Sequence, residues 1–150
     1  MASIANIAVY DGAATPVFHT LVPVSVTREK GVVTALWREA VAGVPVNAQV
    51  RAQAAIQQLS SGVYKTELKV EVPVMETIGS QNAAGYTAAP KVAYVNTMNL
   101  VGFFHERSDV AGRRLTKQIV ANLLNNISAS VAAASAGPAS DLFDSLVAPT

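Results

Sequence analysis

Side chains that could bind a phosphate or a base edge occupy alternate positions, apart from Ala55, in residues 49–57 and again in residues 65–71. On both sides of Ser60-Ser61-Gly62 the residues alternate in character, which is the pattern of two strands joined by a tight turn. Successive side chains of a strand point to opposite faces of a sheet, so one face of this hairpin is predicted to be polar. Its positions are Gln49, Arg51, Gln53, Ala55 and Gln57 in the first strand and Lys65, Glu67, Lys69 and Glu71 in the second. This face is a candidate binding surface.

The opposite face of the same hairpin is predicted to be apolar. Its positions are Val50, Ala52, Ala54 and Ile56 in the first strand and Thr66, Leu68, Val70 and Val72 in the second. An apolar sheet face has to be covered, whereas a polar face can stay open to solvent. We therefore expect another element of the fold to lie on the apolar side.

These polar residues have two other interpretations besides a binding surface. The face could be a solvated surface on which lysines and glutamates neutralise one another. It could also be catalytic, but the chain has no cysteine, no nucleophile elbow and no phosphate-cradling glycine loop, and Lys69 lies between Glu67 and Glu71. His19 and His105 have no partner at metal-ligand spacing. We expect no catalytic residue, no metal and no cofactor.

Composition points to one domain that associates with copies of itself. The 150 residues are enough for a single core, and the domain is predicted to span residues 1–150. Hydrophobic residues make up 51% and charged residues 14%, which is apolar for a small monomer and favours an obligate oligomer. The formal net charge is only +1, so a polyanion would have to be held locally or by many copies. The first residues do not have the pattern of a signal peptide, and no apolar run is close to the length of a membrane-spanning helix.

Strands are predicted before and after the hairpin from runs of valine, isoleucine, tyrosine and phenylalanine. These runs span residues 4–10, 17–26, 32–42 and 91–104, and turn chemistry follows the first at Asp11-Gly12. The segment 75–90 is rich in Gly, Asn, Ser and Ala, which is typical of a long loop. Residues 4–104 are therefore predicted to form about six or seven strands in an amino-terminal hairpin and a sheet.

Helices are predicted in residues 108–150. The first begins with Ser108 or Asp109 as its cap, and residues 128–136 could prolong it. A second, short helix follows Gly137-Pro138 with Ser140 or Asp141 as its cap. The first helix carries an apolar stripe that we expect to cover the sheet, and its basic residues are predicted to form a solvated outer face. The stripe consists of Leu115, Ile119, Val120, Leu123, Leu124 and Ile127, and the basic residues are Arg113, Arg114 and Lys117.

Several short strings in a fixed order resemble the coat proteins of small single-stranded RNA bacteriophages, the leviviruses. They are VYDG at 9–12, a tryptophan at Trp37, the SSG turn, KVEVP at 69–73, YVN at 94–96, and SD at 108–109 where the helix opens. None of these is diagnostic alone, but their order and spacing together are specific. The resemblance covers most of residues 4–127.

The resemblance implies an α+β fold with an amino-terminal β-hairpin, a five-stranded antiparallel sheet and two carboxy-terminal helices on one face. It also implies a homodimer with a continuous sheet as the building block of an icosahedral capsid, which is assembled in the bacterial host cytoplasm and retained in the virion. The implied partner is a single-stranded viral RNA stem-loop, bound on the inner sheet face with repression of replicase translation. No membrane and no small-molecule substrate are implied.

The resemblance also implies which residues would contact RNA and which would surround the symmetry axes of a shell. The implied RNA-binding positions are Arg51, Gln53, Gln57, Lys65, Lys69, Glu71, Tyr94 and Asn96. Tyr94 would stack on a base, although a half-buried sheet aromatic is an equal alternative. Ala55 and Glu67 depart from the hydroxyl residues of the family pattern. The implied symmetry-axis loop contains Thr77, Gly79, Gly85 and Pro90.

A different class of protein is kept as an alternative. A small dimeric α+β protein could bind a ligand in the cleft between helix and sheet. Material released on denaturation would distinguish the two classes, because a capsid would release RNA and a binding protein would release a small molecule.

Overall fold

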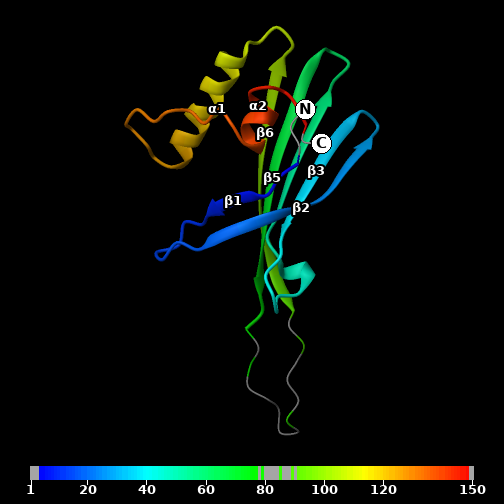
Figure 1. The fold of residues 1–150 in the computed structure, drawn as a ribbon, viewed down its shortest axis with the longest axis vertical. Coiled ribbons are helices and arrows are strands. Elements are labelled where there is room, and N and C mark those ends of the chain that lie inside the picture. The colour runs from blue at the N-terminus through cyan, green and yellow to red at the C-terminus, as the bar shows by residue number, and fades with distance from the viewer. Residues whose placement is uncertain (1–3, 78, 80–84, 86–88, 90, 149–150) are drawn as a thin grey trace.

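The computed structural model describes residues 4–77, 79, 85, 89 and 91–148. These residues form one antiparallel sheet of six strands, paired in the order of the sequence, followed by two helices (Figure 1). The strands are β1 (Ile7–Tyr10), β2 (Phe18–Glu29), β3 (Val32–Glu39), β4 (Arg51–Gln58), β5 (Val63–Met75) and β6 (Val92–His105). A 3-10 helix, η1 (Val46–Ala48), precedes β4, and the helices are α1 (Val110–Leu124) and α2 (Pro138–Phe143). The predicted α+β class is confirmed.

The amino-terminal hairpin and the main sheet share a strand. Leu21 in β2 pairs with Ile7 of β1 on one side and with Glu39 of β3 on the other. A bulge between Pro23 and Ser25 separates this part of β2 from the rest, which pairs only with β3. The described sheet therefore has six strands rather than the seven of a separate hairpin and five-stranded sheet, because the second hairpin strand continues as the first strand of the sheet.

The predicted hairpin between residues 49 and 73 is confirmed as β4 and β5. Gln53 lies opposite Lys69, and Ala54 lies opposite Leu68, so polar pairs with polar and apolar with apolar. Gly62 closes the turn with a φ of +79°, a conformation that side chains disfavour. The segment 32–42, predicted as a strand, forms β3 over Val32–Glu39.

Helix α1 begins where the sequence indicates, whereas its end and the start of α2 differ from the prediction. Asp109 caps α1, since its Oδ1 accepts a hydrogen bond from the Gly112 N–H at 2.8 Å. The helix ends at Leu124, and the possible extension through 128–136 is wrong, because Asn126 turns the chain with a φ of +51°. In α2 neither Ser140 nor Asp141 is the cap. Gly137 occupies that position, and proline begins the helix.

The buried core lies between the sheet and α2. Leu142 and Phe143 of α2 are 0% and 4% exposed and pack with Trp37, Ala52 and Ala54 of the sheet. Trp37 also donates a hydrogen bond from Nε1 to the Ala5 carbonyl at 2.9 Å, which ties the amino terminus to β3. The short second helix therefore provides the cover that the sequence assigned mainly to the first.

Helix α1 does not bury its apolar stripe in its own subunit. Figure 1 shows α1 beside the sheet rather than flat on it. Leu115, Ile119 and Leu123 are 62%, 58% and 79% exposed. The prediction that this stripe covers the apolar sheet face of the same chain is wrong for the described residues. Val120 is partly buried near Leu100 and Phe143, and the rest of the stripe is an uncovered apolar surface.

Candidate nucleic-acid interface

The sheet has two chemically different faces, set by the pairing register. We call the side against α2 the helix face and the opposite side the open face. Arg51, Gln53, Ala55 and Gln57 of β4 lie opposite Glu71, Lys69, Glu67 and Lys65 of β5, so all eight share the open face. The register therefore brings together six of the eight residues predicted to contact RNA, namely Arg51, Gln53, Gln57, Lys65, Lys69 and Glu71.

Charges on the open face are paired with one another. The Nζ of Lys69 lies 2.8 Å from Glu71 Oε1, and the Nε of Arg51 lies 3.3 Å from Glu71 Oε2. The Nζ of Lys65 lies 3.3 Å from Glu67 Oε2. The hydrogen bond from Lys69, with the charges of Lys69 and Arg51, lowers the pKa of Glu71 below its ordinary value, so it stays ionised. The cations of β4 and β5 are thus oriented, and a polyanion would have to compete with two carboxylates for them.

Tyr94 and Asn96 do not share the open face. Tyr94 lies opposite Val74 and Asn96 lies opposite Val72, which places both on the helix side of the sheet. The two residues that the resemblance adds to the RNA-binding set therefore lie on the other side of the sheet from the lysines, because side chains alternate along β6. The open-face positions of this part of β6 are Val95 and Thr97.

Three residues missing from the sequence prediction belong to the open face. Asn99 lies opposite Lys69 and donates from Nδ2 to Glu67 Oε1 at 2.8 Å. Phe103 lies opposite Lys65 and is 62% exposed. Arg38 of β3 lies directly opposite Arg51. The sequence alone does not assign these residues to the open face, because the residues around Asn99 and Phe103 are apolar at both odd and even positions. The pairing register is needed to assign them.

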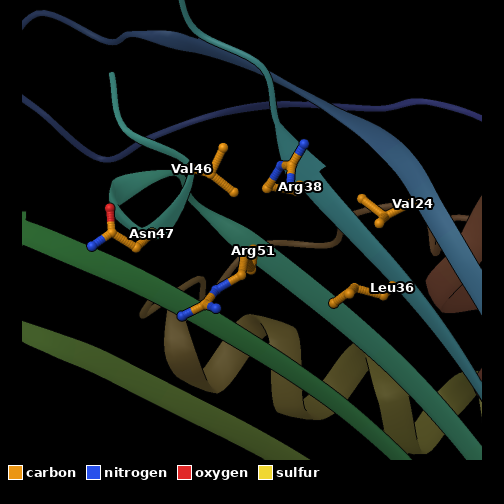
Figure 2. A pocket seen from close by; sticks show the side chains of 6 residues that line it. All are labelled: Val24, Leu36, Arg38, Val46, Asn47 and Arg51. Atoms are coloured by element: carbon orange, nitrogen blue, oxygen red, sulfur yellow. The ribbon is translucent and has the colours of Figure 1, made fainter. Parts of the chain in front are cut away.

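A pocket of about 460 Å³ opens on the open face where β3 and β4 meet η1. Figure 2 shows Arg38 and Arg51 standing between η1 on one side and two aliphatic side chains on the other. The lining residues are Val24, Leu36, Arg38, Val46, Asn47 and Arg51. It combines two guanidinium groups, one amide and an aliphatic wall.

A second, larger hollow lies on the helix face. It has a volume of about 490 Å³ and is walled almost entirely by apolar groups of β1, β4, β5 and the start of α2, including Val9, Leu68, Val70 and Val72. Val70 and Val72 remain 36% and 41% exposed. The apolar sheet face is therefore only partly covered within one subunit.

The basic residues of α1 do not form a solvated outer face as predicted. Arg113 is 7% exposed and donates from Nε to the Asp144 carbonyl at 2.7 Å and from Nη1 to the Ser108 carbonyl. Asp144 is 1% exposed, and its Oδ2 lies 3.0 Å from Arg114 Nε and 2.8 Å from Lys117 Nζ. These four residues form a polar lock between α1 and α2. Sequence reasoning missed it because Asp144 is 27 positions from Lys117.

His19 joins the amino-terminal hairpin to the sheet through two carboxylates. Its Nδ1 lies 2.8 Å from Glu39 Oε1, and its Nε2 lies 3.5 Å from Asp11 Oδ2. The hydrogen bond to Glu39 is the main cause that raises the pKa of His19 above 6.5. Backbone hydrogen bonds from Val17 and Ala13 lower the pKa of Asp11.

The described residues contain no group of three or more His, Cys, Asp and Glu able to hold a metal.

The predicted symmetry-axis loop falls largely outside the described residues. Thr77, Gly79 and Gly85 are described and exposed, and Pro90 is outside. Gly85 has a φ of +77°.

No helix in the described part of the chain is long and apolar enough to cross a membrane.

Comparison with known proteins gives one consistent family. The family described as levivirus coat protein matches residues 2–146. No curated protein matches the chain. Among solved structures, the virus-like particle of bacteriophage EMS014 is 28% identical with a TM-score of 0.71, covering 99% of both chains. The virus-like particle of Beihai levi-like virus 21 is 23% identical with a TM-score of 0.64, covering 87% of this chain and 99% of that one. The capsid protein of bacteriophage GA is 18% identical with a TM-score of 0.59, covering 95% and 94%.

Proposed function

The chain belongs to the levivirus coat protein family, and from that premise we propose that it forms dimers whose open faces bind a single-stranded RNA stem-loop inside the shell. Its role is that of a capsid-forming structural protein, as a component of the virion. The finer steps in the proposal are pairing through the sheet edge, assembly in the host cytoplasm, RNA capture and repression of replicase translation. The observation that carries the RNA-binding step is the asymmetry of the sheet, which has helices on one face and an uncovered polar surface on the other.

The dimer is supported by three surfaces that a single subunit leaves uncovered. β6 is the last strand of the described sheet, runs for 14 residues and pairs only with β5, so its outer edge has free backbone hydrogen-bonding groups. The apolar stripe of α1 is exposed, and so are Val70 and Val72 of the helix face. A two-fold axis beside β6 joins the two sheets and lays each α1 on the partner's apolar face. One operation then covers all of these surfaces.

The RNA surface is supported by side-chain chemistry on the open face. Lysine and arginine can contact phosphates, and glutamine can pair with base edges. The proposed contacts are Arg51, Gln53, Gln57, Lys65, Lys69 and Glu71. Because Tyr94 and Asn96 point to the other side of the sheet, base stacking has to use another residue, and Phe103 is the exposed aromatic of the open face. We therefore expect binding to depend more on phosphate contacts than on stacking by tyrosine.

The connection between β5 and β6 is proposed to surround the symmetry axes of the shell. It joins the ends of the two longest strands, Met75 and Val92, at the end of the sheet away from the helices (Figure 1). The proposed residues are Thr77, Gly79, Gly85 and Pro90. Glycine at positive φ, as at Gly85, allows a backbone to take alternative turns in different symmetry environments.

The capsid proposal is tested by electron microscopy of the purified recombinant protein together with its 260/280 nm absorbance ratio. Uniform shells with a nucleic-acid spectrum are expected. Small dimers that release no RNA on denaturation would contradict the proposal. If such dimers released a small molecule instead, the apolar hollow on the helix face would be its site and the protein would be a ligand-binding protein.

RNA recognition is tested separately on dimers with a genomic hairpin. Lys69→Gln should weaken hairpin binding about threefold to tenfold, because one phosphate contact is lost. Lys30→Gln is the matched control, since it removes the same charge from the turn between β2 and β3. Equal affinities for the two variants would contradict the assignment of the open face.

A further inference from the structure

The pocket at Arg38 and Arg51 places two positive groups side by side, and only one of them has a carboxylate partner. The two arginines are directly opposite each other in the β3–β4 register. Like charges at such positions repel and destabilise a sheet. Arg51 has Glu71 as an ion-pair partner, but among the described residues no carboxylate lies within ion-pair distance of Arg38. The pocket therefore carries an excess of positive charge.

Both guanidinium groups also have unused hydrogen-bonding capacity. The Nε of Arg38 and the Nε of Arg51 are buried and have no hydrogen-bond partner in the described part of the chain. Although Arg51 Nε is 3.3 Å from Glu71 Oε2, that contact lacks hydrogen-bond geometry. Buried donors without acceptors are costly, so neither guanidinium is held in place by a hydrogen bond from its Nε within the subunit. A guanidinium pair is well matched to a phosphate, which accepts several hydrogen bonds at once.

The remaining walls of the pocket fit the organic part of a nucleotide. Val24 and Leu36 form an aliphatic wall on one side of the two arginines, and Val46 and Asn47 of η1 lie on the other side (Figure 2). The volume of about 460 Å³ lies within the range of small-ligand sites. Apolar walls beside a cationic group suit a ribose or a base attached to a phosphate better than a bare phosphate ion.

We infer that this pocket binds one nucleotide of single-stranded RNA, with its phosphate at Arg38 and Arg51 and its nucleoside against Val24, Leu36 and Val46. The inference rests on the proposed RNA-binding function of the open face. It adds a binding residue, Arg38, and a subsite at the β3 side of that face. Strand β3 and η1 thereby extend the RNA surface beyond the β4–β5 hairpin. An unpaired segment that leaves the stem-loop could occupy this site.

The test measures binding of a fluorescein-labelled ten-nucleotide oligouridylate to dimers by fluorescence anisotropy over a series of salt concentrations. Each phosphate contact on a single strand contributes about 0.7 to the slope of log affinity against log salt. Arg38→Gln should therefore reduce the slope by about 0.7 and lower affinity about threefold to tenfold. Arg38→Lys should restore most of the slope, because it restores the charge. Arg28→Gln is the matched control, since Arg28 lies opposite Val33 on the helix side of the same strands.

A second variant tests the aliphatic wall. Val46 is 63% exposed, so Val46→Ser should leave the fold intact, lower oligouridylate affinity about twofold to threefold and leave the salt slope unchanged. An unchanged affinity would overturn the nucleoside contact. Circular dichroism of each variant verifies that it is folded.

The outcomes separate this inference from the proposed function. If wild-type dimers bind the oligonucleotide and Arg38→Gln behaves like Arg28→Gln, the pocket inference is overturned and the open-face proposal stands. The pocket inference is also overturned if the wild type binds a genomic hairpin but not the oligonucleotide. If the wild type binds neither RNA and its particles are empty, the proposed RNA-binding function itself is overturned.

Discussion

Leu123→Ala should weaken the dimer while leaving the subunit fold unchanged. Leu123 lies near the end of α1 and is 79% exposed, so its side chain contributes little to the core of its own subunit. In the proposed dimer the same side chain is buried against the partner. The substitution thus separates association from folding.

The expected size of the effect follows from the area that becomes buried. Full burial of a leucine side chain stabilises by about 2 kcal/mol, and most of that side chain is available for burial here. A two-fold interface contains the residue twice, so truncation should cost about 3 kcal/mol per dimer. This corresponds to a rise of roughly 150-fold in the dimer dissociation constant.

The measurement is sedimentation of dimers, under conditions that prevent shell assembly, over a wide range of protein concentrations. Val41→Ala is the matched control, because Val41 is 44% exposed and lies after β3, away from α1. If the free subunit is unstable, the same difference should appear as a stronger concentration dependence of urea unfolding. A Leu123→Ala dimer as tight as the Val41→Ala dimer would refute the assignment of the stripe to the interface.

Three further predictions concern charges. Asp144→Asn should lower the free energy of unfolding by about 3 kcal/mol in urea, because it leaves the partly buried Lys117 and Arg114 without their counter-charge, while Asp141→Asn should cost under about 1 kcal/mol. Equal losses would contradict the polar lock. The raised pKa of His19 means that its ion pairs stabilise fully below pH 6.5 and weaken as the pH rises through the folded-state pKa. The melting-temperature difference between wild type and His19→Gln should therefore shrink between about pH 5.5 and about pH 8.5, and a constant difference would count against this coupling. Glu67→Gln should raise oligouridylate affinity about threefold by releasing Lys65, and unchanged binding would place Lys65 outside the RNA surface.

The parts of the fold that local pattern controls could be predicted from the sequence. Strict alternation on both sides of Gly62 predicts the β4–β5 hairpin, its register and the seven polar residues of its open face. An acidic residue three positions before Gly112 predicts the start of α1. In each case the information lies within a few residues of the feature.

The parts that depend on distant partners could not be predicted in the same way. The segment 91–104 is apolar at both odd and even positions, so periodicity does not indicate which side of the sheet Tyr94 faces. Its side is fixed only by the pairing of β6 with β5. From the sequence alone, the guanidinium of Arg113 is expected to be solvated. The fold instead places it against the backbone carbonyl of Asp144, which is distant in the sequence. Arg38 becomes a site residue only because β3 places it opposite Arg51.

The orientation of α1 links the internal polar lock to assembly. Arg113 and Lys117 lie on one side of the helix, and Leu115, Ile119 and Leu123 lie roughly on the other. Because Asp144 holds the basic side inward, the apolar stripe has to face outward. The contacts of the polar lock therefore determine which side of α1 faces the partner in the proposed dimer, as well as where α2 packs. Weakening the lock should consequently loosen the dimer, whereas changes at Arg38 on the far face of the sheet should affect RNA binding and leave the dimer intact.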